Sequence, residues 1–562
     1  MHVNERPHQA PAVTGPRKWA VLAVMSASLF LVGIDVTVLH VALPSLIRDL
    51  RPSATAVLWI VDVYSLTVAA LLVTSGTLGD RIGRKRMVLT GFAVFGVASA
   101  AASVSATTAQ LIGARLLLGA GAAMIMASTV AIIRSVFPNR RERAVALGAW
   151  TAAHSAGAML GPVLGGVLVE RWGWGSVFLI NLPVVLLVLA IGVRLIPESR
   201  SSTPRRWRPA DAALSVAALG LTVYAVKQLG EHPSAWAAAT GAVGLALVVI
   251  FVLRQRRISD PLLDLTLFAD RQFTAATVCV LVCFGCSTSL LFFLTQRFQL
   301  VDGFTPVQAG LALLPLGAAT AVGAGAAPWV AARWGHRTAL VVALAVFAAA
   351  VAVLPAALGG PVVPIVLIVI GTAVGVVETL GADLVMSAAS EERAGEASAI
   401  QETAFELGAG VGIAMLGTVL AIGYRVALPH SASEAGQSLG SAVKVAEALP
   451  PPQAANLLNA AGEAFQSGLI VTLTGTAVLL GLTAALALVL LREARRTSPV
   501  HLDVRPGSHT SPSFVLSDVC GRKEGHAARV QPVRDQVSRG RGGGGRDPRG
   551  DRAAARPRPP QR

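Results

Sequence analysis

Apolar stretches of about 20 residues alternate along the chain with short segments rich in charged residues, proline or glycine. A helix of this length crosses the hydrocarbon core of a bilayer, which is about 30 Å thick. The pattern predicts an all-α integral membrane protein with fourteen spans. We place them at 20–43, 56–78, 87–106, 109–133, 144–169, 174–196, 211–229, 236–253, 273–296, 308–332, 338–357, 362–387, 397–422 and 467–491.

The connections between the spans alternate in charge. Lys and Arg gather in one set: Arg17 and Lys18; Arg81, Arg84, Lys85 and Arg86; Arg140, Arg141 and Arg143; Arg205, Arg206 and Arg208; Arg254, Arg256 and Arg257; Arg333 and Arg337. By the positive-inside rule, this set and both termini are expected in the cytoplasm, with the chain in the plasma or inner membrane. A soluble helical bundle does not explain an alternation over so many loops.

The spans divide the chain into five expected parts. These are a cytoplasmic N-terminus (1–18), a six-helix bundle (19–196), two inserted spans with linkers (197–272), a second six-helix bundle (273–491) and a basic cytoplasmic tail (492–562). Residues 423–466 are expected to form an extracellular loop with short surface helices. The tail lacks apolar periodicity and is expected to be disordered. For the tail, contact with anionic lipid or no function is favoured over nucleic-acid binding.

Composition agrees with a membrane protein, because 54% of the residues are hydrophobic, 14% are charged and the mean hydropathy is +0.63. No cleavable signal peptide is predicted, since the first apolar stretch from Trp19 is too long. Cys279, Cys283 and Cys286 share one helix face, which allows a soft-metal site, but buried thiols are the favoured interpretation. The sequence lacks a P-loop, H-E-x-x-H and G-x-S-x-G, so we expect no enzyme, no cofactor and no metal.

The segment GTLGDRIGRKRMVL at 76–89 places one acid among four basic residues between two spans. A tight turn there needs glycine, and Asp80 lies where it can cap a helix or pair with Arg81 or Arg84. RIGRKRMVL at 81–89 is repeated in a more degenerate form as RWGHRTALV at 333–341, after the tenth span. Spans one to six and nine to fourteen are therefore expected to be equivalent halves, a plan that recurs in secondary transporters.

This segment resembles the loop between spans two and three of the major facilitator superfamily. The matching residues are Gly76, Leu78, Asp80, Arg81, Gly83, Arg84 and Lys85. The resemblance implies the major facilitator fold, two six-helix bundles here joined by two inserted helices. It also implies that this loop acts as a latch between inward-facing and outward-facing states.

Three further stretches resemble motifs of the fourteen-span drug:H⁺ antiporters of that superfamily. GAMLGPVLGG at 157–166 is similar to the antiporter motif of span five, with Gly157, Gly161, Pro162, Gly165 and Gly166 in place. Small residues at every fourth position let a neighbouring helix approach closely. LVGIDVTVLHVALPSL at 31–46 and RLLLGAGAA at 115–123 resemble the motifs of spans one and four. Span ten lacks the additional acid of some members, which disfavours divalent substrates.

Ionisable residues inside spans usually mark a pathway or a partner pair, because a charge at bilayer depth costs at least ~2.5 kcal/mol. Asp35 in span one and Arg115 in span four lie at similar depth and are expected to meet. The resemblance implies that both line the central cavity, where Asp35 binds a proton or cation and Arg115 modulates its acidity. A static ion pair without a transport role is the alternative.

The remaining candidates for proton or substrate coupling are Glu402, Glu406, Glu378, Asp383, Asp62 and His154. Glu402 and Glu406 share one helix face in span thirteen, where two carboxylates cannot easily both be ionised. Glu378 and Asp383 do not share a face, and Asp383 is open to the role of a cytoplasmic helix cap. For Asp62 and His154 the alternatives are packing or a place at the outer interface.

Together these features predict proton-driven efflux of a lipophilic, cationic drug or antiseptic by drug:H⁺ antiport with alternating access. The expected partners are the small-molecule substrate, protons and the bilayer, with no nucleic acid, and the expected state is a monomer. Export of an antibiotic or metabolite that the host itself makes is an alternative with the same fold and coupling. A membrane sensor that does not transport is a more distant one.

Overall fold

The computed structural model describes residues 15–200, 208–231, 234–258, 261, 264–389, 393–428, 435–437 and 439–491. The predicted N-terminal segment before residue 15 and the predicted tail 492–562 lie outside these residues. Every regular element in the described part of the chain is helical. Fourteen of its helices are long and apolar enough to cross a membrane, which confirms the predicted number of spans.

The helices of the N-terminal half are α1 Pro16–Leu50, α2 Ala54–Ile82, α3 Arg84–Ser103, α4 Thr108–Val136, α5 Arg140–Trp172, α6 Ser176–Leu179 and α7 Asn181–Leu195. The two inserted helices are α8 Pro209–Glu231 and α9 Ala235–Arg257. The C-terminal half contains η1 Leu265–Ala269, α10 Arg271–Gln296, η2 Arg297–Val301, α11 Pro306–Trp334, α12 His336–Ala357, α13 Val363–Ala388, α14 Ala394–Ala427, η4 Ala435–Gln437, α15 Leu439–Glu447 and α16 Pro451–Leu490. We call the end of the bundle at which α1, α3 and α5 begin the basic end, and the opposite end the far end.

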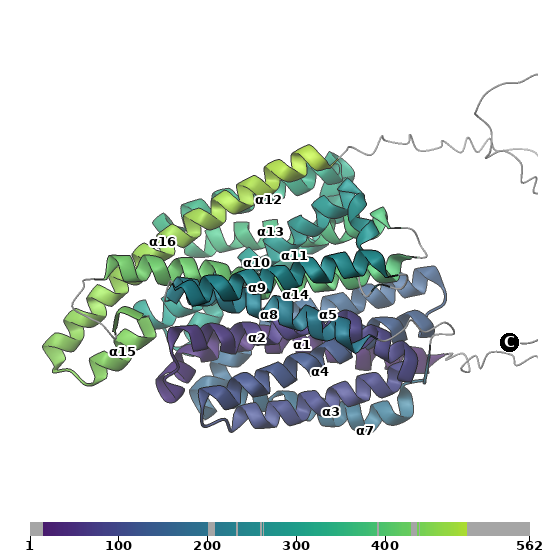
Figure 1. Ribbon diagram of the computed structural model, residues 1–562, viewed down its shortest axis with the longest axis horizontal. Coiled ribbons are helices and arrows are strands. Elements are labelled where there is room, and N and C mark those ends of the chain that lie inside the picture. Colours follow the sequence, from purple (N-terminus) through teal and green to yellow (C-terminus); the bar gives the residue numbers. More distant parts are fainter. Residues whose placement is uncertain are drawn as a thin grey trace, which may run out of the picture. The chain divides into compact units, whose positions relative to one another are not determined.

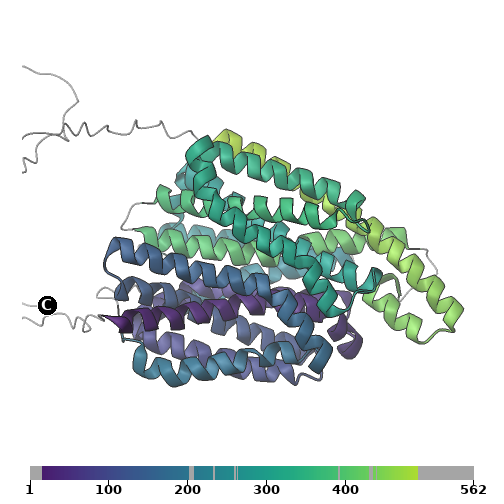
Figure 2. The same cartoon turned by 180° about the vertical axis from the view of Figure 1, so that it is seen from behind.

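The two halves repeat one packing scheme. In the N-terminal half, α1 packs on α5, α2 and α3 pack on α4, and α3 packs on α7. In the C-terminal half, α10 packs on α14, α11 and α12 pack on α13, and α12 packs on α16. Figure 1 shows the purple and blue helices of the first half on one side and the green and yellow helices of the second half on the other, and Figure 2 shows the same division from behind.

The repeated loop motif adopts a similar backbone in both halves. Gly83 separates α2 from α3 with φ 113°, and Gly335 separates α11 from α12 with φ 82°. These φ values lie in the region that favours glycine, so one glycine stops each helix and lets the next begin at once. The similarity between 81–89 and 333–341 thus reflects equivalent turns.

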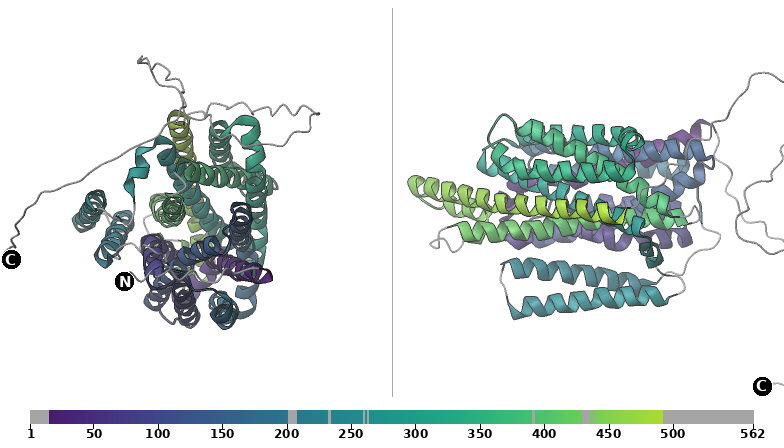
Figure 3. Two further views of the ribbon diagram at one scale, coloured as in Figure 1. Left: turned by 90° about the vertical axis from the view of Figure 1, so that its right-hand side faces the viewer. Right: turned by 90° about the horizontal axis from the view of Figure 1, so that it is seen from above.

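The inserted helices form an antiparallel pair beside the two halves (Figure 3). α8 packs on α9 and also contacts α2 and α14, whereas α9 contacts η1 and is the least buried of the fourteen spans. Apolar side chains on an exposed span are compatible with lipid, because hydrocarbon solvates them as well as a protein core does. α8 is therefore the element that connects the pair to both halves.

Glycines of α5 bring two other helices into backbone contact. A Cβ atom on Gly157 or Gly161 would collide with Phe30 or Thr37 of α1, and one on Gly165 would lie 2.8 Å from a methyl group of Val38. On another side of α5, a Cβ on Gly166 would lie 2.6 Å from the carbonyl oxygen of Pro306 in α11. The close approach expected from the spacing therefore involves α1 within the same half and α11 of the other half.

The segment 423–466 is more helical than the sequence analysis expected. α14 continues to Ala427 and α16 begins at Pro451, so both spans extend into the predicted loop, and only α15 matches the expected short helices. Alanine favours helix, and Pro451 and Pro452 occupy the first turn of α16, where proline is tolerated. Hydropathy marks the apolar part of a helix and not its ends, which explains the difference.

The α5 contacts predict different effects for two glycine-to-alanine variants in one helix. Gly157→Ala adds a methyl group against the backbone of α1, and overpacking of this kind typically costs about 1–3 kcal/mol. Gly148→Ala is the matched control, because Gly148 is exposed and has open space around its Cα. We expect thermal unfolding of the purified protein in detergent to show a lower Tm for Gly157→Ala only. Equal Tm values for both variants would contradict the packing.

Candidate functional site

Asp35 and Arg115 form a buried ion pair at the centre of the N-terminal half. The Nη1 atom of Arg115 lies 2.9 Å from the Oδ2 atom of Asp35, and both side chains are inaccessible to solvent. Arg115 also donates to the carbonyl oxygen of Ile60, and its guanidinium lies 4.5 Å from the centre of the Tyr64 ring. The amide of Asn181 donates to the Oδ1 atom of Asp35. The structure therefore places the two predicted residues together and satisfies both carboxylate oxygens.

Asp62 is paired with a lysine that the sequence analysis did not select. The Nζ atom of Lys227 in α8 lies 2.9 Å from the Oδ2 atom of Asp62 in α2, and both side chains are fully buried. Lys227 lies inside the predicted span 211–229. It could have been selected from the sequence, because a lysine at membrane depth usually has a specific partner. This ion pair joins an inserted helix to the N-terminal half.

Three glutamates of the C-terminal half differ from these aspartates. Glu406 is buried, Glu402 and Glu378 are partly buried, and none of the three has a salt bridge with a described Lys, Arg or His. The Ser65 side chain of α2 lies next to the Glu406 carboxylate. Glu406 therefore faces the N-terminal half across the contact between α14 and α2.

Two other candidates lie apart from this group. Asp383 pairs with the Nε2 atom of His336 at 3.0 Å, and both side chains are about half exposed, at 60% and 49%. His336 begins α12 at the basic end, so Asp383 lies at that end and not in a central site. The backbone oxygen of His154 lies against Gly33 of α1, and its ring forms no ion pair with a described residue.

A small polar cavity lies between the two halves. It has a volume of about 10 Å³, which is room for about one water molecule, and is lined by residues of α1, α2, α4, α10 and α14. Its polar walls are formed by His40, Asp62, Tyr64, Ser65, Arg115 and Thr288. His40 is buried, and neither of its ring nitrogens has a hydrogen-bond partner in the described part of the chain. His40 could not be selected from the sequence, because nothing in the pattern distinguishes it from a packed residue of span one.

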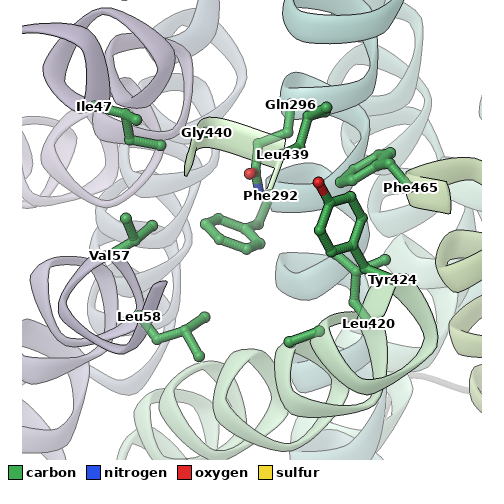
Figure 4. Close-up of a pocket in the computed structure, with 12 residues that line it drawn as sticks. Ile47, Val57, Leu58, Phe292, Gln296, Leu420, Tyr424, Leu439, Gly440 and Phe465 are labelled. Atoms are coloured by element: carbon green, nitrogen blue, oxygen red, sulfur yellow. The ribbon is translucent and has the colours of Figure 1, made fainter. Parts of the chain in front are cut away.

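An apolar cleft of about 70 Å³ lies nearer the far end (Figure 4). Its walls are Ile47, Val57, Leu58, Phe292, Gln296, Gly417, Leu420, Ala421, Tyr424, Leu439, Gly440 and Phe465. The side chains come from α1 and α2 on one side and from helices of the C-terminal half on the other. The Phe292 ring also contacts the His40 ring, with centroids 5.9 Å apart. Phe292 therefore borders the apolar cleft while it touches a wall of the polar cavity.

The loop between α2 and α3 is held by two acids. Asp80 forms an ion pair with Arg84 at 2.8 Å, which is one of the two partners that the sequence left open, and Arg84 donates to the carbonyl oxygen of Ala131 in α4. Glu198, after α7, accepts from the backbone nitrogen of Lys85, and a Cβ on Gly83 would lie 2.5 Å from its Oε1 atom. Glu198 was missed, because its partner lies 113 residues away.

A family model described as the Major Facilitator Superfamily matches residues 25–413. The chain belongs to this superfamily. The equivalent halves, the loop 76–89 and the glycine contacts of α5 are therefore features of a superfamily member, and the protein is a multi-pass membrane protein.

Two relatives and one solved structure are similar to the chain over most of its length. It is 40% identical over 491 residues to the multidrug efflux pump LfrA of Mycolicibacterium smegmatis, covering 85% of this chain and 97% of that protein. It is 35% identical to the methyl viologen resistance protein SmvA of Salmonella typhimurium, covering 80% and 93%. A crystal structure of a bacterial homologue of the human lysosomal transporter Spinster, in an inward-facing unoccupied conformation, has a TM-score of 0.58 at 17% identity, covering 85% and 98%, and supports the fold.

The Asp35–Arg115 pair predicts a specific order of stabilities. Arg115→Met leaves Asp35 buried without its cation, which typically costs about 3–5 kcal/mol. The Asp35→Asn/Arg115→Met double variant removes both charges and is expected to unfold at a higher temperature than Arg115→Met alone. Arg333→Met, at an exposed position of the basic end, is the control and should leave Tm nearly unchanged. If the double variant is no more stable than Arg115→Met, the unpaired charge of Asp35 is not what destabilises the Arg115→Met protein.

Proposed function

We propose that the protein exports lipophilic organic cations across the cell membrane in exchange for protons. Relatives that cover most of the chain carry names that refer to multidrug efflux and to resistance to methyl viologen, which is an aromatic organic dication. The proposed process is transport without a catalysed reaction. The basic end and both termini are proposed to face the cytoplasm, in accordance with the positive-inside rule.

The observation that carries the proposal is the unequal distribution of buried charge. Asp35 and Asp62 each have a basic partner, whereas Glu378, Glu402 and Glu406 have none among the described residues. An unpaired charge at bilayer depth costs at least ~2.5 kcal/mol, so each glutamate is most stable when it binds a proton or faces a cationic ligand. A group that accepts either ligand but not both provides the exchange that an antiporter needs.

The two cavities suggest how an organic cation binds. The aromatic and aliphatic walls of the far-end cleft suit the apolar body of such a molecule, as in most small-ligand sites. The polar cavity beyond Phe292 is bordered by Asp62 and by Ser65, a neighbour of Glu406. Both cavities lie between the halves, where alternating access moves a site from one side of the membrane to the other.

The available driving force is sufficient for this exchange. One charge moved through 100 mV supplies ~2.3 kcal/mol, whereas each tenfold concentration difference costs ~1.4 kcal/mol. One proton per substrate suffices for a neutral drug. A monovalent cation needs more than one proton to gain from the voltage, and several glutamates without basic partners suit that requirement.

The loop between α2 and α3 is proposed to act as the latch between conformations. Its ion pair, its bond to α4 and its contact with Glu198 hold the cytoplasmic ends of several helices of the N-terminal half together. The working unit is proposed to be a monomer, since the cavities are formed by one chain.

Efflux of a fluorescent lipophilic cation from intact cells, with inside-out vesicles as a second system, tests the proposal. We expect cells with the wild-type protein to keep the dye out and to lose this ability when a proton uncoupler is added. Glu402→Gln and Glu406→Gln are expected to reduce uphill efflux to near the level of cells without the protein. Glu463→Gln, which changes an exposed glutamate of α16, is the matched control and should behave as the wild type.

The amount of each variant protein in the membrane is compared by immunoblot, so that a failure to insert is not mistaken for a loss of proton coupling. Efflux that continues after the proton gradient has collapsed would contradict proton coupling. Efflux that remains normal in a variant with Gln at positions 378, 402 and 406 would contradict the role of the glutamates.

A further inference from the structure

Lys227 is an unusual residue for the helix that carries it. α8 belongs to the inserted pair, and only a minority of its central residues are buried within the protein. The Lys227 ammonium group is nevertheless fully buried against the Asp62 carboxylate of α2. A lysine near a helix end in a membrane usually extends toward water, so burial of this one indicates a specific partner.

The surroundings of the ammonium group resemble a binding site for an organic cation. The Nζ atom lies 4.1 Å from the centre of the Trp59 ring, and the Trp59 and Tyr224 rings are 6.4 Å apart. A carboxylate combined with the face of an indole ring is a chemistry that attracts substituted ammonium ions. In this structure the cation in that position is the side chain of Lys227.

The ion pair is weakly held by other polar groups. Apart from each other, neither the Lys227 ammonium nor the Asp62 carboxylate has a hydrogen-bond partner in the described part of the chain. Asp35 differs, because Asn181 and Arg115 together satisfy both of its oxygens. The free-energy cost of removing a buried ion pair from water is poorly offset when the pair has no further hydrogen bonds. Another cation can therefore replace Lys227 beside Asp62 at a lower free-energy cost than it could replace Arg115 beside Asp35.

Asp62 also borders the polar cavity between the two halves, which Thr288 of α10 lines as well. His40, on the same cavity wall, has no hydrogen-bond partner for either ring nitrogen among the described residues. One carboxylate therefore lies between a cation supplied by the protein and a small polar cavity at the contact between the two halves.

We propose that Lys227 is an internal competitor for Asp62, which holds the carboxylate while the cavity is closed and releases it to an organic cation that enters when the halves separate there. The inference rests on the proposed function for the class of substrate and adds a role for the inserted helices. Through Lys227, α8 sets the affinity of the cavity for cations and senses whether a cation is bound. Neutral ligands do not compete with Lys227 and are unaffected by it.

Equilibrium binding of tetraphenylphosphonium to the purified full chain in detergent tests this role without any gradient. In Lys227→Gln the amide still donates a hydrogen bond to Asp62 but carries no charge, so we expect about tenfold tighter binding than in the wild type. Lys227→Arg keeps the charge and should bind as the wild type does. Asp62→Asn should bind about tenfold more weakly, because Lys227 then remains as an unmatched positive charge.

The decisive comparison is made in the Asp62→Asn background. There Lys227→Gln should relieve the repulsion, but the affinity should stay below that of Lys227→Gln alone, because no carboxylate is left to receive the cation. Tm values recorded with each variant show whether it is folded. If Lys227→Gln does not fold, the lower affinity expected for the Asp62→Asn variant tests the proposal by itself.

The possible results separate the two proposals. If the wild type binds tetraphenylphosphonium well and both Lys227→Gln and Asp62→Asn bind it with the same affinity, the competitor role is wrong. The proposal of cation efflux is then unaffected. Weaker binding in Lys227→Gln would also overturn it and would make the lysine a structural tether. Absence of tetraphenylphosphonium binding in every variant, the wild type included, would count against the proposed substrate class itself.

Discussion

The free-energy cost of a charge within a bilayer is the constraint on which the interior of this protein depends. Hydrocarbon offers no hydrogen bonds to an ionised side chain, so each such group needs a partner, a proton or a ligand. The protein meets this requirement differently in its two halves. Arg115 matches Asp35 and Lys227 matches Asp62, whereas the glutamates of α13 and α14 have no described basic partner. In the proposed function, this difference between the halves lets the interior respond to protons and to organic cations.

Close glycine packing, both within the halves and between them, complements this arrangement. Glycines of α5 contact the backbones of α1 and α11, and glycines of α10 and α14 contact each other in the same manner. Contacts made by small residues involve few interlocking side chains, and they permit helices to change their angle without a large loss of packing. The cavities lie between the halves and are lined by α1, α2, α10 and α14. Three of the helices that line the cavities, α1, α10 and α14, therefore also pack through glycine contacts.

The number of spans, the repeated halves and the Asp35–Arg115 contact could be predicted from the sequence, because they follow from apolar length, local repeats and the cost of buried charge. The partners of Asp62 and of the α2–α3 loop could not be predicted from the sequence. Lys227 is distant from Asp62 in the chain and reaches it through the packing of α8. Glu198 is likewise distant from the loop and reaches it through the path of the chain after α7. His40 also resembles a packed residue until the cavity beside it is known. Helix ends were underestimated, since α16 extends well beyond its apolar stretch.

The central claim is that one set of buried carboxyl groups binds either protons or an organic cation. Its most direct test is a measurement of proton release when methyl viologen or tetraphenylphosphonium is added to the purified protein in a weakly buffered solution with a pH indicator. The account predicts release in proportion to the cation bound, with little release from a variant that has Gln at positions 378, 402 and 406. Saturating cation binding without proton release, over the pH range in which the protein is folded, would contradict the account.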